Sequence, residues 1–476
     1  MQTVFDTQSF RQLGHQLIDL LADYLEEVTT DTDTPILPYR DPEVELAFWQ
    51  ADFASGSTDV PKFFQHVLDH SIRLHHPHYV GHQVAVPALV GGLAGMISDV
   101  LSNGTGVYEM GMASNALERV VTDFTAQAIG FGPMAGGLLT SGGTLANLTA
   151  LLAARQAKVP SAWQKGQDEQ LAILVSEEAH YCVDRAVRIM GWGEDGVIKV
   201  PVDEHFKVRT NLLPQYLTQA KQQGRRVIAV VGCAASTATG SYDDLEAIAD
   251  FCEAHDLWLH VDGAHGGAVV FSQRYRHLAK GIERADSVVI DYHKMLLTPA
   301  LNTALIYRDG GLANQTFTQR AQYLWEEQQA PEWYHSGKRT FECTKLMLSL
   351  KVYSIMKTHG KGIFGQNVER LYDLARSFYR MLMADPDFEV VVKPASNILC
   401  FRYIRARDEQ LDWLNTQLRA QLVKSHNFYL VQTVVKGRKY LRTTLMNPLT
   451  EEAHLHLLLE RMRIAATHLV SVLGQE

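Results

Sequence analysis

The stretch SVVIDYHKMLLTP, residues 287–299, places a charged side chain between two apolar segments. Residues 287–290 have the β-branched composition of a buried strand, and residues 295–297 are apolar again. His293 and Lys294 interrupt this pattern where the strand ends. A buried ammonium group is unfavourable unless it is paired, neutral or covalently bound, whereas a lysine at a strand end can also simply reach water. The surroundings of Lys294 in the fold decide between these two interpretations.

Other short apolar runs in the chain resemble this one and are separated by helical segments. The runs cover residues 171–180, 225–236, 257–265, 286–294 and 302–308. Residues 242–255 have the pattern of a helix that lies between two of them. Strands that alternate with helices predict an α/β fold, in which a mostly parallel sheet has helices on both faces.

Polar side chains stand at or just after the ends of several predicted strands. They are His180, Thr237, Asp262 and Lys294. In an open parallel sheet, ligands bind at the carboxyl ends of the strands. We therefore predict that these four side chains gather at one ligand site, although a histidine or an aspartate at a strand end is also typical of a structural turn.

A glycine-rich loop opens a helix in LLTSGGTLANLTALLAAR, residues 138–155. Gly142 and Gly143 let the backbone approach a ligand closely, and the free N–H groups at a helix start attract an anion. Thr144 adds a hydroxyl group. The spacing is neither that of a P-loop nor Gly-x-Gly-x-x-Gly, so the loop predicts either a phosphate site or a plain helix cap.

One cofactor makes use of all these groups. Pyridoxal 5′-phosphate (PLP) needs a lysine for covalent attachment, an acid that faces its pyridine nitrogen, a phosphate cradle and a flat group over its ring. Lys294, Asp262, the loop at residues 142–144 and His180 supply these four elements. On this hypothesis Lys294 is buried because it is bonded to the cofactor.

The composition argues against several other classes of protein. The chain has 476 residues, 46% of them hydrophobic, and a net charge of -9, with no basic block that would bind a nucleic acid. The five cysteines are scattered, and histidines 75, 76 and 78 lack metal-ligand spacing, so we expect neither a disulfide framework nor a metal site. The polar N-terminus and the short, glycine-containing apolar run at residues 84–97 predict a cytoplasmic protein without a membrane span.

The order of the motifs resembles the group II PLP-dependent amino-acid decarboxylases, which include the aromatic amino-acid, glutamate, cysteine sulfinate and diaminobutyrate enzymes. The resemblance covers about residues 60–460 and consists of SGGT, AHYCVDRA, STATGSYDDL, HVDGAHGG, DYHK and LRTTLMNP, in this order. It implies the type I fold of PLP-dependent transferases, with a seven-stranded, mostly parallel sheet. It also implies a homodimer with the active site at the interface. The expected parts are an N-terminal helical segment (1–85), a large PLP-binding domain (86–365) and a small C-terminal α/β domain (366–476).

The resemblance also implies roles for individual residues. Lys294 is expected to bond to the cofactor, Asp262 to pair with the ring nitrogen, and His180 to stack on the ring. The other positions that match cofactor contacts are Gly142, Gly143, Thr144, Thr237, Ala264 and His293. The chain departs from the family pattern at Asp291-Tyr292, where Asn-Pro is common, at Ala235-Ser236, where Gly-Thr is common, and at His265.

The implied activity is decarboxylation of an L-amino acid to its amine. Tyr323, in the polar segment 317–339, is expected to return a proton to the substrate Cα, with this segment closing over the site across the dimer interface. The alternative on the same fold is an aldehyde-forming enzyme, and an aminotransferase or a carbon–carbon lyase would share the lysine and the aspartate.

Three residues suggest the substrate class. His82 and Gln83 stand where the aromatic-specific branch carries bulky aromatic side chains, and Arg442 matches an arginine that binds the α-carboxylate. They favour a small polar or acidic amino acid, namely aspartate, glutamate, cysteine sulfinate or 2,4-diaminobutyrate. An aromatic amino acid is the alternative.

Overall fold

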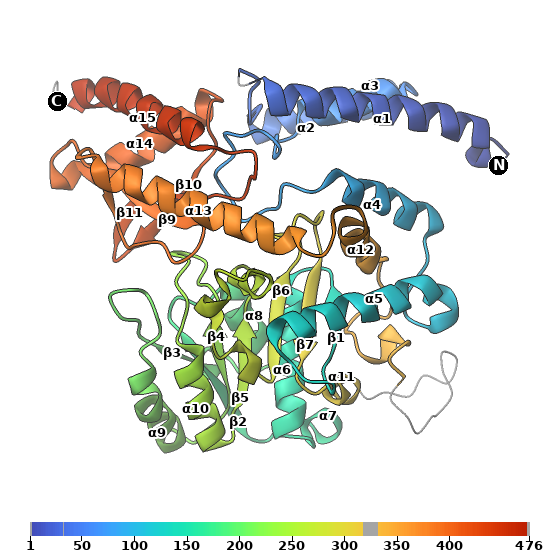
Figure 1. The fold of residues 1–476 in the computed structure, drawn as a ribbon, viewed down its shortest axis with the longest axis vertical. Coiled ribbons are helices and arrows are strands. Elements are labelled where there is room, and N and C mark those ends of the chain that lie inside the picture. The colour runs from blue at the N-terminus through green and yellow to red at the C-terminus, as the bar shows by residue number, and fades with distance from the viewer. Residues whose placement is uncertain (1, 32, 318–331, 474–476) are drawn as a thin grey trace. The chain divides into compact units, whose positions relative to one another are not determined.

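The computed structural model describes residues 2–31, 33–317 and 332–473 (Figure 1). The chain divides into two compact units. The large unit comprises Gln83–Ala375 and Val392–Ile398, and the small unit comprises Met1–His82, Arg376–Val391 and Leu399–Glu476. The expected domain boundaries after residues 85 and 365 remain predictions. In the structure, the N-terminal segment belongs to the same compact unit as most of the C-terminal segment.

The large unit contains the predicted seven-stranded sheet. Its strands are β1 (Gly136–Thr140), β2 (Gln170–Ser176), β3 (Val197–Val200), β4 (Arg225–Cys233), β5 (Trp258–Asp262), β6 (Ser287–Asp291) and β7 (Thr303–Tyr307). They lie in the order β1-β7-β6-β5-β4-β2-β3. The pairs from β3 to β6 are parallel, whereas β7 is antiparallel to both β6 and β1. The predicted mostly parallel sheet is confirmed.

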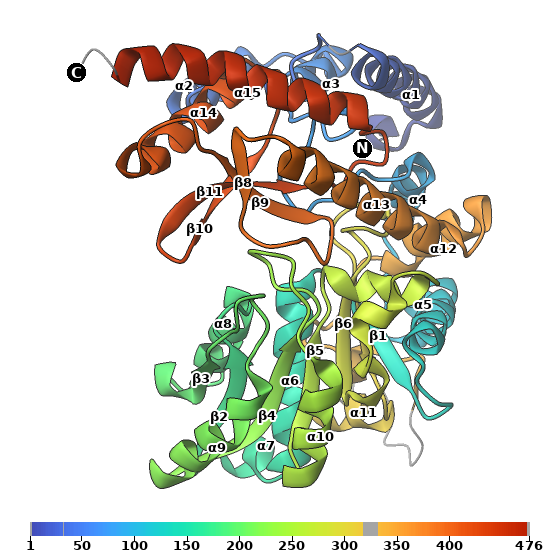
Figure 2. The same cartoon turned by 60° about the vertical axis from the view of Figure 1, so that its left-hand side comes forward.

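Helices cover both faces of this sheet, which is why β1, β5, β6 and β7 are buried along their whole length. The helices of the large unit are α4 (Leu89–Leu101), α5 (Tyr108–Ile129), α6 (Gly143–Lys158), α7 (Ala162–Lys165), α8 (Tyr181–Ile189), α9 (Leu213–Gln222), α10 (Leu245–His255), α11 (Gly311–Thr316), α12 (Leu348–His359) and the first part of α13 (Ile363–Ala384). Helix α6 packs on one face of the central strands and α10 on the other (Figure 2).

The small unit combines helices with a four-stranded sheet. The helices are α1 (Thr7–Thr30), α2 (Pro42–Ser55), α3 (Val60–Asp69), the last part of α13, α14 (Leu411–Lys424) and α15 (Glu452–Leu473). The strands are β8 (Phe388–Val390), β9 (Ile398–Tyr403), β10 (Val431–Val435) and β11 (Arg438–Thr444), in the order β10-β11-β9-β8. Among the helices that the structure describes, none has the length and apolar character needed to cross a bilayer.

Backbone hydrogen bonds tie the N-terminal segment into the small unit. The Ile36 N–H donates to His426 O over 3.1 Å, and the Val80 N–H donates to Tyr429 O over 3.0 Å. The Val80 carbonyl in turn accepts from the Thr444 N–H over 2.9 Å. These bonds join residues more than 300 positions apart and explain why the first part of the chain belongs to the same unit as its C-terminal sheet.

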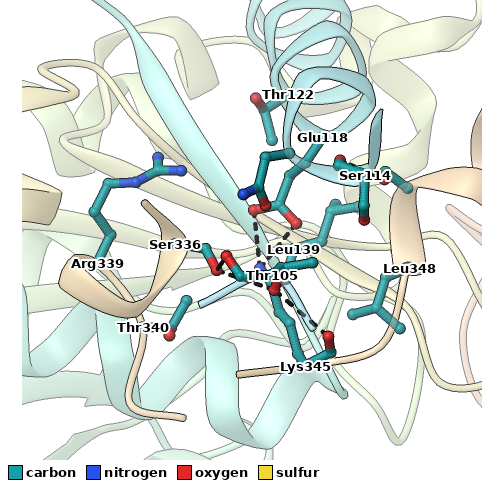
Figure 3. Close-up of polar contacts among 12 residues, drawn as sticks. Thr105, Ser114, Glu118, Thr122, Leu139, Ser336, Arg339, Thr340, Lys345 and Leu348 are labelled. Atoms are coloured by element: carbon teal, nitrogen blue, oxygen red, sulfur yellow. Dashed lines mark hydrogen bonds and ion pairs between the residues drawn. The ribbon is translucent and has the colours of Figure 1, made fainter. Parts of the chain in front are cut away.

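A buried ion pair connects three parts of the large unit (Figure 3). Lys345 Nζ lies 2.8 Å from the Glu118 carboxylate on α5, and the two side chains are 2% and 4% exposed. Lys345 also donates to Leu139 O on β1 over 2.5 Å. Nearby, Ser336 Oγ donates to Thr105 O over 2.6 Å. These bonds attach the chain between Ser336 and α12 to the scaffold formed by α5 and β1.

Candidate active site

One cavity of about 480 Å³ in the large unit contains all nine predicted cofactor-binding residues in its wall. These residues are Gly142, Gly143, Thr144, His180, Thr237, Asp262, Ala264, His293 and Lys294. They come from the carboxyl ends of β4, β5 and β6 and from the first turns of α6 and α8. Five chain segments thus converge at one edge of the sheet, as the position of ligand sites in such sheets predicts.

The charge of Lys294 is balanced by a neighbouring carboxylate. Lys294 Nζ lies 3.0 Å from Asp291 Oδ2, and the two side chains are 20% and 3% exposed. Asp291 also accepts a hydrogen bond of 2.5 Å from Thr303 Oγ1 on β7. The lysine between two apolar segments is therefore partly buried and paired, and its amino group borders the cavity. This pairing was not predicted, because in the sequence Asp291 is noticeable only as a departure from the family pattern.

Asp262 supplies a buried carboxylate at the end of β5. Its Oδ1 accepts from the Ala264 N–H over 3.2 Å, which orients the carboxyl group where the chain leaves the strand. A buried anion is stable only beside a cation or sufficient hydrogen bonds. The protonated pyridine nitrogen of PLP is such a cation, so Asp262 fits the ring end of this cofactor.

His180 is held as a neutral ring in the same cavity. It is the N-cap of α8, and its Nδ1 accepts from the Cys182 N–H over 3.3 Å. Burial lowers the pKa of the His180 imidazole, an effect that the carboxylate of Asp262 opposes and the charge of Lys294 reinforces. Because Nδ1 accepts, the proton of the neutral ring is on Nε2. A flat ring with a fixed orientation fits the predicted stacking on a cofactor ring.

The start of α6 fits a phosphate group. Gly142 has φ +133°, a left-handed conformation that favours glycine, and no side chain in the described part of the chain caps the helix. A Cβ atom at Gly143 would stand 3.1 Å from Asp291 Oδ1, so the backbone is closely packed here. The first N–H groups of a helix need a partner from outside the helix, and an anion is a favourable one.

The three predicted substrate residues are not among those that line this cavity. His82 and Arg442 belong to the small unit, where burial and then the charges of Arg442 and Arg419 lower the pKa of His82. Gln83 belongs to the large unit but does not line the cavity. Tyr323 lies outside the described residues. The roles of these four residues stay predictions.

Several side chains at the cavity were not predicted as functional. Besides Asp291 they are Asn147, Cys182, Arg185 and His265. Asn147 follows the Ser-Gly-Gly-Thr loop by one helical turn within an apolar run, which is a signal that could have identified it. Within the described residues, no group of three or more His, Cys, Asp or Glu side chains could hold a metal ion.

Known proteins of similar sequence and fold point to the same chemistry. Residues 59–404 match the pyridoxal-dependent decarboxylase conserved domain. The chain is 28% identical over 457 residues to an aromatic-L-amino-acid decarboxylase of Bacillus atrophaeus, which covers 93% of this chain and 92% of the relative.

Solved structures share the fold. Mouse CSAD aligns with a TM-score of 0.89 at 23% identity, covering 97% of this chain and 99% of that one. The glutamate decarboxylase domain of a diaminobutyrate-pyruvate transaminase and L-2,4-diaminobutyrate decarboxylase from Vibrio parahaemolyticus aligns with a TM-score of 0.84 at 24% identity, covering 96% of each chain. Oryza sativa TDC, solved with PLP and tryptamine, aligns with a TM-score of 0.89 at 21% identity, covering 98% and 99%.

The matched domain includes every residue that lines the cavity, from Ser141 to Leu301. The expected family, fold and cofactor are thereby confirmed. A lysine amino group, a buried carboxylate and an uncapped helix start at one sheet edge are what PLP requires of a protein. This chain belongs to the pyridoxal-dependent decarboxylase family and is a PLP-dependent amino-acid decarboxylase.

Proposed function

We propose that the protein decarboxylates a small polar or acidic L-amino acid, such as aspartate, glutamate, cysteine sulfinate or 2,4-diaminobutyrate, and releases the amine and CO₂. The observation that carries this choice is Arg185, a cationic side chain of α8 that lines the cavity in addition to Lys294. Its guanidinium carbon lies 4.8 Å from the centre of the Tyr181 ring, which restrains it. Among the candidates, an arginine fork at the site favours the anionic side chains of aspartate, glutamate and cysteine sulfinate, whereas an aromatic side chain offers it no acidic group to bind.

Different residues of the cavity would have different roles in the reaction. When bound, PLP withdraws electrons from the substrate Cα as the carboxyl group leaves. Lys294 Nζ would hold the cofactor by a covalent bond, and Asp262 would keep the ring nitrogen protonated. His180 would cover one face of the ring and exclude water there. The N–H groups of Gly143 and Thr144 at the start of α6 would hold the phosphate.

A panel of L-amino acids, with products identified by mass, tests the proposed substrate class. We expect the acidic substrates aspartate, glutamate or cysteine sulfinate to give a higher kcat/KM than 2,4-diaminobutyrate or any aromatic amino acid, with one amine formed for each CO₂. The Arg185→Gln variant should lower kcat/KM for acidic substrates by about tenfold or more and change the value for neutral ones much less. Fastest turnover of an aromatic amino acid, or an aldehyde product in place of the amine, would show that the proposal is wrong.

The aromatic alternative has one observation in its favour. The relative from Bacillus atrophaeus that matches 93% of the chain at 28% identity is an aromatic-L-amino-acid decarboxylase. The same panel decides between the two classes, because tyrosine, tryptophan and 3,4-dihydroxyphenylalanine would then react faster than any acidic substrate.

We also propose that the protein is a homodimer with its active site at the interface. Helix α4 supports this proposal because it exposes six apolar side chains, each at least 42% exposed: Leu89, Leu93, Met96, Ile97, Val100 and Leu101. A continuous apolar surface of this kind is unfavourable in water and suits a self-complementary, two-fold contact.

Sedimentation equilibrium tests the dimer. The wild type should have twice the chain mass of 53.3 kDa, and Leu93→Glu/Ile97→Glu should shift it to the monomer. Val434→Glu changes a side chain of the small unit that is similarly exposed, at 62%, and serves as the control that should leave the mass unchanged. A wild-type protein that is monomeric at micromolar concentration would contradict the proposal.

A further inference from the structure

A buried chain of hydrogen bonds joins the sheet to the first turn of α6. Trp258 Nε1 donates to Ser287 Oγ over 2.9 Å, and Ser287 Oγ lies 2.8 Å from His260 Nδ1. His260 Nε2 lies 2.7 Å from Asn147 Oδ1. Asn147 Nδ2 donates to Gly143 O over 3.0 Å. All five residues belong to the large unit, and the functions assigned to the cavity so far make no use of His260 or Asn147.

The groups at the two ends of this series determine which atom donates in each hydrogen bond. The indole N–H of Trp258 can only donate, and the Gly143 carbonyl can only accept. Asn147 therefore presents its amino group to Gly143 and its carbonyl oxygen to His260, so that His260 Nε2 carries a proton. Burial lowers the pKa of His260 to about 4, so the ring is neutral and its Nδ1 accepts from Ser287. Every donor in this series of hydrogen bonds then has an acceptor.

The chain connects the two places where the cofactor is expected to bind. Asn147 lines the cavity and is bonded to Gly143, the first residue of α6. His260 precedes Asp262 by two residues on β5, so both side chains project from the same face of the sheet. Asn147 Nδ2 also lies 3.5 Å from Cys182 Sγ on α8, the helix that His180 caps.

We propose that His260 and Asn147 are positioning residues that hold the phosphate-binding turn of α6 at a set distance from Asp262. The proposal rests on the function proposed above, in which the phosphate of PLP binds at the start of α6. The side chains of His260 and Asn147 are buried, at 0% and 1% exposure, so water cannot replace a missing hydrogen-bond partner. Removal of one of these hydrogen bonds would therefore shift the first turn of α6.

Binding of two forms of the cofactor to the apoprotein tests the proposal, because pyridoxal lacks the phosphate that PLP carries. Asn147→Leu is expected to raise the Kd for PLP about tenfold and the Kd for pyridoxal less than about twofold. His260→Gln places an amide N–H near the Nε2 position and should keep the Kd ratio of the wild type. His260→Asn reaches only the Nδ1 position and should behave like Asn147→Leu.

Two further variants separate the possible outcomes. Trp258→Phe removes the remote donor and is expected to leave the ratio of the two Kd values unchanged, while Thr144→Ala alters the proposed cradle itself. An equal loss of affinity for PLP and pyridoxal in Asn147→Leu and His260→Asn would mean a general structural role and overturn the proposal. If only Thr144→Ala lost affinity for PLP and not for pyridoxal, the positioning role of His260 and Asn147 would be overturned, while the proposed phosphate site at the start of α6 would be supported. If no variant lost affinity for PLP more than for pyridoxal, both the positioning role and the phosphate site at the start of α6 would be overturned.

Discussion

Replacement of Lys294 by alanine is expected to lower kcat for decarboxylation by at least about 10³-fold. The change removes the amino group that would bond to the cofactor. It also leaves the carboxylate of Asp291, whose side chain is 3% exposed, without the cation that lies 3.0 Å from it. Initial rates of amine release measure the loss. Borohydride reduction followed by peptide mass analysis should add the reduced cofactor to Lys294 of the wild type and to no peptide of the variant.

Lys294→Arg is the control that separates chemistry from charge. The guanidinium group keeps a positive charge beside Asp291 but is not a nucleophile at neutral pH. We therefore expect the arginine variant to unfold at a temperature close to that of the wild type and to be as inactive as the alanine variant. Either variant retaining more than about a tenth of wild-type kcat would contradict the role of Lys294.

Replacement of Lys345 by methionine is expected to lower the free energy of unfolding by about 3–5 kcal/mol. The change leaves the Glu118 carboxylate, whose side chain is 4% exposed, without the ammonium group 2.8 Å away (Figure 3). A buried carboxylate must then remain charged without its partner or take up a proton, and both are unfavourable. The hydrogen bond to Leu139 O is lost as well. Urea-induced unfolding followed by far-UV circular dichroism measures the change.

The double variant Glu118→Gln/Lys345→Met tests whether the unpaired Glu118 carboxylate causes the loss of stability. It removes both charges, so we expect it to recover at least half of the stability that the single variant loses. The pair does not line the cavity, and folded Lys345→Met protein should bind PLP with nearly the affinity of the wild type. A loss below about 1 kcal/mol in the single variant would show that the ion pair contributes little to the stability of the large unit.

Local pattern in the sequence determined most of the large sheet. The apolar runs that predict β2, β4, β5, β6 and β7 are each confirmed to within a few residues, because strands covered on both faces are almost continuously apolar. Strands β1 and β3 were not predicted: β1 is a short run directly before the glycine loop, and β3 has four residues. The antiparallel direction of β7 was not predicted either, since alternation along a strand contains no information about the direction of its neighbour.

The common location of the polar side chains also followed from the sequence, because strand ends meet at one sheet edge whatever the lengths of the loops between them. His180, Asp262 and Lys294 are thus found together at one cavity, as predicted. The predicted substrate-binding residues do not follow strands of the large sheet, so the same rule could not locate them. His82 and Arg442 lie in the small unit, and their role depends on the substrate.

Only the tertiary structure decided which polar groups are partners. His260 and Asn147 are separated by 113 positions, and each has the sequence context of an ordinary core residue. Lys345 and Glu118 are separated by 227 positions, and either alone resembles a surface charge. The physical reason is that periodicity depends on neighbours along the chain. A buried hydrogen bond or ion pair depends on two side chains that packing brings within about 3 Å.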